Sequence, residues 1–230
     1  MSLKDKQKKD KKDKKKKPLF SLRFLLYDFV KITGAIPAYI WIKPRVTYES
    51  DIAKKGVKDG AIIISNHTGV TDPVKLHCAF WYRRFYLLAF KELFERKLSR
   101  FFFSHMLCLP VDRENFNMNT FNAVEDVTKK GYYVGIYPEG RILHEEGTVG
   151  DFKGGAVMMA LRSGVPIIPV YCTPYKKFFS FNDIIIGEPI DVKALCGQFP
   201  SLEKLEEVSN FVREKELHLI DIYNDRRKKK

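Results

Sequence analysis

Short apolar runs and longer stretches of helical pattern alternate along this chain. The apolar runs predict strands at 46–48, 61–65, 86–90, 107–111, 133–137, 167–171 and 184–186. The stretches between them predict helices at 73–82, 93–103, 120–130, 155–163 and 202–223. Alternation of this kind predicts an α/β domain of layered form, in which helices flank a mainly parallel or mixed sheet.

An apolar segment, residues 18–44, precedes the first predicted strand. It contains charged residues such as Asp28, and its longest uncharged run, 32–42, is too short to span a hydrocarbon core of roughly 30 Å. Gly34 and Pro37 lie in that run, so an interfacial helix and a turn suit it better. A signal peptide fits poorly, because no clean apolar core precedes a small-residue cleavage site. The segment predicts a peripheral or monotopic protein on the cytoplasmic face of the membrane, with a core helix and connector as the alternative.

The net charge of +13 lies almost wholly in two tails, because residues 1–17 contribute +7 and residues 226–230 contribute +5. Residues 4–17 contain no apolar side chain, so this tail is predicted to be disordered. The tail either stays solvated or is attracted to anionic lipid head groups. That attraction contributes about 1 kcal/mol per basic residue near the membrane surface. The interior has no obvious helix-turn-helix, zinc-finger or aromatic RNA-binding signature, so no nucleic-acid partner is expected.

A chain of 230 residues is long enough for one domain with a substantial core. The predicted organisation is a disordered basic tail at 1–17, an interfacial helical segment at 18–44, the α/β domain at 45–225 and a basic tail at 226–230. The four cysteines form no CxxC pair, and the histidines outside the cluster described next lack ligand spacing. The sequence therefore predicts neither a disulfide framework nor a metal site.

A histidine and an aspartate follow the predicted strand at 61–65. His67 and Asp72 have four residues between them, and Pro73 follows at once. In open α/β sheets, ligands bind beyond the carboxyl ends of strands. A turn can return the Asp72 carboxylate to one nitrogen of His67 and leave the other nitrogen as a base. Capping of the following helix is a second role for Asp72, and it is compatible with the first.

No enzyme nucleophile accompanies this histidine. The neighbouring hydroxyl residues Ser65, Thr68 and Thr71 lack the GxSxG turn that would expose a serine. A base without a nucleophile of its own implies that the substrate supplies the hydroxyl, which narrows the chemistry to direct transfer.

Three further clusters contain residues suited to anions. In "YPEGR", Gly140 permits close approach of the backbone to a ligand, Arg141 suits phosphate, and Glu139 could accept from a hydroxyl or hold Arg141. The alternative is an ordinary turn with a surface ion pair.

Arg113 is a second phosphate candidate, or else the partner of Asp112 or Glu114 in an ion pair. In "DFKGGA", Lys153 precedes two glycines and a helix, so it could help to hold an anion or lie in an exposed loop.

In their order along the chain, these blocks resemble the glycerophospholipid acyltransferase superfamily, in particular the bacterial 1-acylglycerol-3-phosphate acyltransferases. The matching positions are Asn66, His67 and Asp72, then Asp112-Arg113, then Tyr137 to Gly140, then "VPIIPV" at 165–170. The resemblance extends from about 62 to 190. Two positions depart from the family pattern: Arg141 occupies the usual Thr position after PEG, and Pro110 stands where an aromatic residue is common.

The resemblance implies that His67, oriented by Asp72, deprotonates a glycerol hydroxyl that attacks an acyl thioester. Arg113, Glu139 and Arg141 would hold the glycerol phosphate, and Asn66, Gly140 and Lys153 complete the expected substrate-binding set. The aromatic run at 101–108 would line an acyl-chain tunnel, or else form plain core.

The implied reaction joins lysophosphatidic acid to a fatty acyl group from acyl-coenzyme A or acyl carrier protein, giving phosphatidic acid. No metal or bound cofactor is expected, since the thioester is a co-substrate, and a membrane surface with anionic lipids is the expected partner. The alternatives are acylation of glycerol 3-phosphate or another lysolipid by the same mechanism, or a catalytically silent lipid-binding protein of the same fold.

Overall fold

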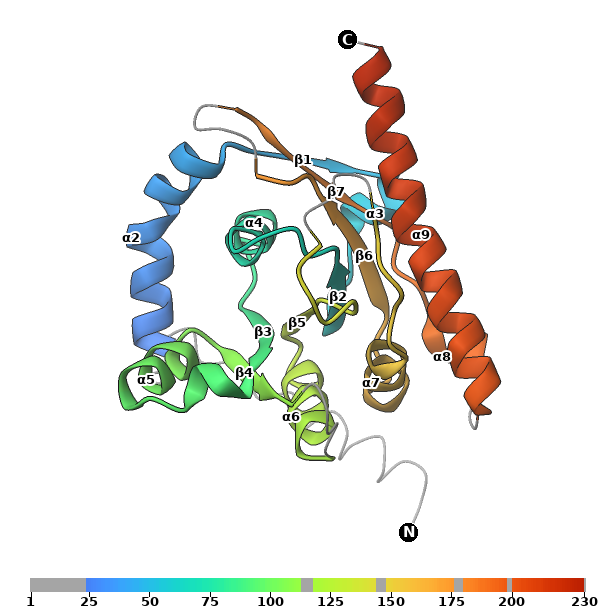
Figure 1. The fold of residues 1–230 in the computed structure, drawn as a ribbon, viewed down its shortest axis with the longest axis horizontal. Helices are drawn as coiled ribbons and strands as arrows, with labels where there is room; N and C mark the ends of the chain where they lie inside the picture. Colours follow the sequence, from blue (N-terminus) through green and yellow to red (C-terminus); the bar gives the residue numbers. More distant parts are fainter. Residues whose placement is uncertain (1–23, 113–117, 144–147, 176–179, 198–199, 230) are drawn as a thin grey trace, which may run out of the picture.

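A seven-stranded sheet with the strand order β1-β7-β6-β2-β5-β3-β4 forms the centre of the molecule (Figure 1). The computed structural model describes residues 24–112, 118–143, 148–175, 180–197 and 200–229. The strands are β1 (Pro44–Tyr48), β2 (Ala61–Ser65), β3 (Phe85–Phe90), β4 (Cys108–Val111), β5 (Tyr133–Ile136), β6 (Ile167–Cys172) and β7 (Asn182–Ile186). Neighbouring strands are parallel except β6 and β7. The prediction of an α/β domain with a mixed sheet is confirmed.

Helices cover both faces of the sheet. They are α2 (Leu25–Ile42), α3 (Asp51–Lys55), α4 (Asp72–Ala79), the 3₁₀ helix η2 (Lys91–Phe94), α5 (Lys97–His105), α6 (Met118–Lys129), α7 (Gly155–Ser163), α8 (Val192–Cys196) and α9 (Leu202–Lys228). Alternate residues of β2 point to opposite faces, so Ile62 and Ile64 pack with α6, α7 and α9, while Ile63 packs with α4. Figure 1 shows α2 on the outer side of α4.

The N-terminal segment differs from its prediction in one respect. The turn expected near Gly34 and Pro37 is wrong, because α2 is one continuous helix through both residues. Its ends are fixed by Tyr27 and Ile42, which are fully buried, and the Tyr39 hydroxyl donates to the Cys78 carbonyl. These contacts offset the hydrogen bond that a proline removes from a helix interior. In the described part of the chain, α2 is the one helix long and apolar enough to cross a membrane.

Other differences lie at element ends and in short helices. Helices α3 and α8 were not predicted; they have five residues each and begin at capping side chains, Ser50 and Asp191. Helix α9 continues past 223 to Lys228, so the basic residues Arg226 and Arg227 are helical. The tail predicted at 1–17 lies outside the described residues.

The sheet brings three strand ends to one edge. Strand β2 is buried along its whole length and lies between β5 and β6, parallel to both. The segments after Ser65, Ile136 and Cys172 therefore meet at the carboxyl edge of the sheet. This edge holds the candidate functional site.

The close packing of β5 generates a testable prediction. A Cβ atom added at Gly135 would lie 2.5 Å from Cζ of Phe85 and 2.7 Å from Cδ2 of Leu87. We expect Gly135→Ala to lower the free energy of unfolding by about 1–3 kcal/mol, measured by urea denaturation. Gly34→Ala is the matched control, since nothing lies within 4 Å of its added Cβ. Equal stability of the two variants would contradict the prediction.

Candidate active site

The turn between β2 and α4 brings Asp72 back to His67. Nδ1 of His67 lies 3.1 Å from Oδ2 of Asp72, and the same oxygen accepts from the backbone N–H groups of Thr68 at 2.6 Å and Gly69 at 2.8 Å. Asp72 is the first residue of α4 and is fully buried. Its carboxylate thus binds the preceding turn, and the N-cap position of α4 belongs to Thr71.

A buried lysine that the motifs did not predict balances the charge of Asp72. Nζ of Lys75 lies 2.9 Å from Oδ1 of Asp72 and 2.6 Å from the carbonyl oxygen of Thr173, and the lysine side chain has no exposed surface. Burial acts to raise the pKa of Asp72, but hydrogen bonds from His67 and Lys75 and the lysine charge outweigh it and hold that pKa below its usual value. The sequence signal was the spacing of Asp72 and Lys75, which puts them on one face of a helix.

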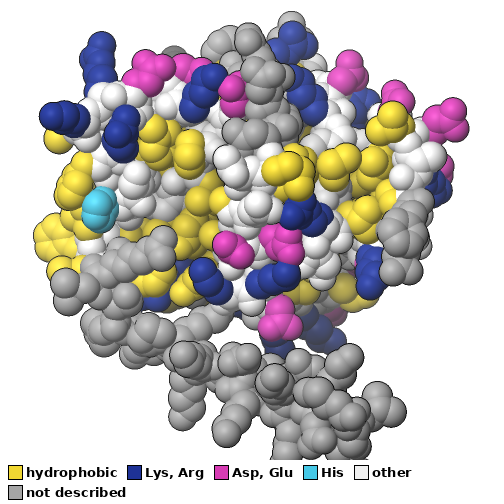
Figure 2. Space-filling model, turned by 90° about the horizontal axis from the view of Figure 1, so that it is seen from below, with side chains coloured by type: hydrophobic (Ala, Val, Ile, Leu, Met, Phe, Trp, Pro, Cys, Tyr) yellow, Lys and Arg dark blue, Asp and Glu magenta, His cyan; other side chains and the backbone are white. Residues whose placement is uncertain are grey.

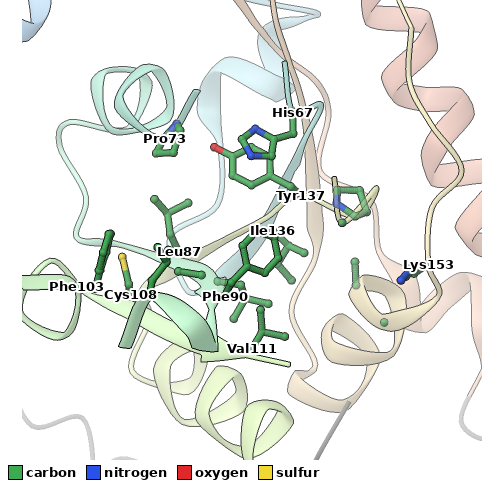
Figure 3. A pocket seen from close by; sticks show the side chains of 17 residues that line it. His67, Pro73, Leu87, Phe90, Phe103, Cys108, Val111, Ile136, Tyr137 and Lys153 are labelled. Atoms are coloured by element: carbon green, nitrogen blue, oxygen red, sulfur yellow. The ribbon is translucent and has the colours of Figure 1, made fainter. Parts of the chain in front are cut away.

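His67 forms one wall of an apolar cavity of about 220 Å³. Its ring stacks on that of Tyr137, with centroids 4.1 Å apart and planes at 15°. Figure 3 shows these two rings together, with Lys153 on one side of the cavity and Phe103 and Cys108 on the other. A second apolar cavity, of about 300 Å³, lies between α2, α4 and α5 and shares Phe103 and Cys108 with the first.

The segment after β5 adds a buried carboxyl group. Glu139 is 6% exposed, and its Oε1 accepts from the backbone N–H of Gly150 at 3.1 Å. Burial raises the pKa of Glu139, although the Gly150 hydrogen bond and the nearby His67 and Arg141 act to lower it. A buried carboxyl group with few donors keeps a proton more readily than one that is fully hydrogen-bonded.

Gly140 and Lys153 lie together at the rim. The backbone of Gly140 has φ of +64°, a conformation that favours glycine, which explains its place in this turn. A Cβ at Gly140 would lie 4.0 Å from Nζ of Lys153, and both residues line the cavity with His67. Arg141 is exposed. Gly140 and Lys153 therefore lie at the same rim of the cavity, and their contact with substrate stays a prediction.

The predicted substrate residue Asn66 makes a structural contact. The side-chain amide of Asn66 is buried and clamps the backbone of Cys172, donating to its carbonyl at 2.9 Å and accepting from its N–H at 2.9 Å. These contacts hold β2 to the end of β6, and substrate contact by Asn66 stays a prediction. Arg113 lies outside the described residues, while Asp112 before it accepts from Nζ of Lys91 at 2.5 Å.

The aromatic run at 101–108 divides between cavity and surface. Phe103 and Cys108 line the cavity, whereas Phe101 and Phe102 are 55% and 49% exposed. Helix α5, which contains the three phenylalanines, has no buried residue, so plain core does not describe it. Within the described parts of the chain, no three His, Cys, Asp or Glu side chains are grouped as metal ligands.

Residues 43–173 match the sequence profile of the Acyltransferase family, and they contain His67, Asp72, Glu139, Gly140 and Lys153. The chain belongs to this family. The match covers more than half of the chain and confirms the resemblance drawn from the sequence motifs. It ends before α9 begins, so this helix of the acyltransferase lies outside the matched region.

Individual relatives of this acyltransferase carry more specific names. The 1-acyl-sn-glycerol-3-phosphate acyltransferase of Bacillus subtilis (strain 168) is 32% identical over 151 residues, which are 64% of this chain and 74% of that protein. The protein of the same name from Streptococcus pneumoniae is 27% identical over 175 residues, 73% of this chain and 64% of that protein. The chain thus spans slightly less than two thirds of the second relative.

A solved structure supports the fold. The crystal structure of the 1-acyl-sn-glycerophosphate acyltransferase PlsC from Thermotoga maritima matches with a TM-score of 0.62 at 20% identity, over 88% of this chain and 81% of that one. The mixed sheet and its flanking helices are therefore those of the acyltransferase fold.

The buried pair of Asp72 and Lys75 leads to a prediction about stability. Lys75→Met keeps most of the apolar stem but leaves the Asp72 carboxylate without its cation. We expect it to lower the free energy of unfolding by about 3–5 kcal/mol near pH 7, measured by urea denaturation. The control is Lys129→Met, which removes an exposed ion pair with Glu125 and should cost less than about 1 kcal/mol.

The difference in free energy of unfolding between the parent and Lys75→Met should depend on pH. Because the pKa of Asp72 is lowered by folding, its charged form stabilises the protein above its unfolded pKa, and this stabilisation is lost as the pH falls through its folded pKa. Lys75→Met raises the pKa of Asp72, and a protonated Asp72 needs no cation. The difference between parent and variant should therefore narrow towards pH 3, and a constant difference would show that the charge of Asp72 is not its source.

Proposed function

We propose that this acyltransferase moves a fatty acyl group from acyl-coenzyme A or acyl carrier protein to the free hydroxyl of 1-acylglycerol-3-phosphate, giving phosphatidic acid and a free thiol. The observation that carries this proposal is the hydrogen-bonded pair of His67 and Asp72 beside an apolar cavity with Lys153 at its rim. The names of the relatives support the same acceptor.

In the proposed mechanism, His67 acts as the base. Nδ1–H of His67 donates to Asp72, which leaves Nε2 to take the proton of the acceptor hydroxyl. The hydroxyl oxygen attacks the thioester carbonyl, the C–S bond breaks, and the imidazolium returns its proton to the departing sulfur. The Asp72 carboxylate stabilises the imidazolium between these steps. General base catalysis of this kind contributes about 10²–10⁴-fold to the rate.

The rim groups suit an anionic acceptor. Lys153 and Arg141 would hold its phosphate, and Gly140 lets the backbone approach. Glu139 would accept from a substrate hydroxyl or orient Arg141. Apolar side chains line most of the cavity, and the second cavity beside Phe103 extends it towards α2, which suits a fatty acyl chain. The transfer balances with the two substrates alone, so no metal or resident cofactor enters the proposal.

The outer surface of α2 supports a position on the membrane. Its exposed hydrophobic side chains are Leu25, Phe29, Ile32, Ile36, Tyr39, Ile40 and Trp41. Leu98, Phe101 and Phe102 of α5 are exposed as well. Figure 2 shows hydrophobic side chains at the left rim, the side on which Figure 1 places both helices. We propose peripheral or monotopic binding to the cytoplasmic leaflet, with the basic segments 1–17 and 226–230 attracted to anionic lipids.

Activity of the parent chain and the His67→Ala variant tests the reaction. The purified proteins are incubated with lysophosphatidic acid and either acyl-coenzyme A or acyl carrier protein, and free thiol and phosphatidic acid are measured together. We expect product from the parent and a rate lower by about 10²–10⁴-fold for His67→Ala. His218→Ala, at an exposed histidine on α9, is the control and should retain the parent rate. Thiol release without phosphatidic acid, or no reaction with either donor, would contradict the proposal.

Vesicle sedimentation tests the membrane surface. The double variant Ile32→Ser, Ile36→Ser removes two exposed apolar groups from α2, so it should reduce binding to anionic vesicles even at high salt. The matched control is Ile52→Ser, Leu202→Ser, which changes two similarly exposed groups on other helices. Equal loss of binding in both double variants would mean that α2 is not the membrane-binding surface.

A further inference from the structure

Helix α9 contacts the candidate active site although it lies outside the matched family region. It packs on β6, β7, α7 and α8. Arg213, near the middle of α9, reaches the loop that precedes α7: its Nη2 donates to the carbonyl of Val149 at 2.7 Å and its Nε to the carbonyl of Gly150 at 2.8 Å. The guanidinium fork therefore fixes two successive carbonyls of this loop.

The peptide unit that Arg213 holds is the one that binds Glu139. The carbonyl of Val149 and the N–H of Gly150 belong to the same peptide group. Its oxygen accepts from Arg213, while its N–H donates to Oε1 of Glu139 at 3.1 Å. Since a peptide group is planar, fixing its oxygen also fixes the direction of its N–H. The positive charge of Arg213 polarises the same group and strengthens the bond to Glu139.

Glu216 lies one turn after Arg213 on the same face of α9. It has no exposed surface, and neither of its carboxyl oxygens has a hydrogen-bond partner among the described residues. Oε2 of Glu139 is also buried and makes no hydrogen bond with the described residues. An ionised carboxylate is costly in a buried site without donors or a cation, so Glu216 is expected to hold a proton near neutral pH.

We propose that Arg213 is a positioning residue for Glu139, acting through the Val149–Gly150 peptide, and that its buried neighbour Glu216 is a neutral carboxylic acid. The inference rests on the proposed function, in which Glu139 contacts the acceptor. It places part of the acceptor-binding machinery on a helix outside the region that the family shares by sequence.

The surroundings decide which carboxyl holds the proton. Burial raises the pKa of Glu216 well above its usual value, and the negative charge of Glu139 raises it further, while the backbone of Asn66 and the charge of Arg213 act to lower it. The charge of Glu216 also acts to raise the pKa of the Cys172 thiol in β6. Glu139 has the Gly150 N–H and the nearby His67 and Arg141 to favour its charged form. Glu216 is therefore the more readily protonated of the two carboxyl groups.

Steady-state kinetics test the positioning role. We expect Arg213→Met to raise the KM for the acceptor about ten-fold, with the KM for the acyl donor and the melting temperature nearly unchanged. Arg213→Lys, which can hold one of the two carbonyls, should recover part of this loss. The control is Arg162→Met, which removes a surface arginine paired with Glu125.

An acceptor KM that Arg213→Met leaves unchanged, or a loss shared equally by both substrates and the melting temperature, would overturn the proposal.

Infrared difference spectroscopy tests which carboxyl group holds the proton, without any assay of activity. The full chain at pH 7 should show the carbonyl band of a protonated carboxylic acid, which remains in Glu139→Gln and is lost in Glu216→Gln. The opposite pattern, or no band in the parent, would overturn the assignment. If the parent proves inactive on every acceptor while the band behaves as expected, the proposed function fails and the placement of the proton on Glu216 stands.

Discussion

The buried charge of Asp72 is the constraint on which the rest of the site depends. An ionised carboxylate without exposed surface is costly unless donors and a cation surround it. Here two backbone N–H groups of the preceding turn, His67 and Lys75 supply them. The same contacts fix the turn after β2, the first residues of α4 and, through the Thr173 carbonyl, the end of β6. The geometry of His67 is thus a consequence of satisfying one carboxylate.

Much of the fold follows from local sequence pattern. The bounds of β2 and α7 agree with prediction, because each has an uninterrupted apolar or periodic run with clear flanking residues, such as Gly164 after α7. The pairing of His67 with Asp72 was also predictable, since both belong to one turn. Pro37 misled the prediction, because the burial of Tyr27 and Ile42 that holds α2 together involves contacts with distant segments.

The unpredicted part of the site comes from contacts between segments far apart in sequence. Lys75 was detectable only as a helical neighbour of Asp72, and its second contact, with Thr173, required the sheet order. Arg213 and Glu216 carry no local signal at all, since a charged residue in a periodic helix ordinarily faces solvent. Only the packing of α9 on β6 and the loop before α7 turns them inward.

Two buried carboxyl groups at one sheet edge have opposite electrostatic surroundings. Asp72 has a lysine and two N–H donors on it, and its pKa lies below the usual value, so it stays charged and can steady a protonated His67. Oε1 of Glu139 accepts from the backbone N–H of Gly150, and burial raises the pKa of Glu139. Surroundings that shift the pKa values of two carboxyl groups in opposite directions let Asp72 serve as a fixed charge and let Glu139 respond to a ligand. A phosphate held by Lys153 and Arg141 would bring its own charge close to Glu139, so that the loop anchored by Arg213 becomes the means of keeping this carboxyl group in place against repulsion.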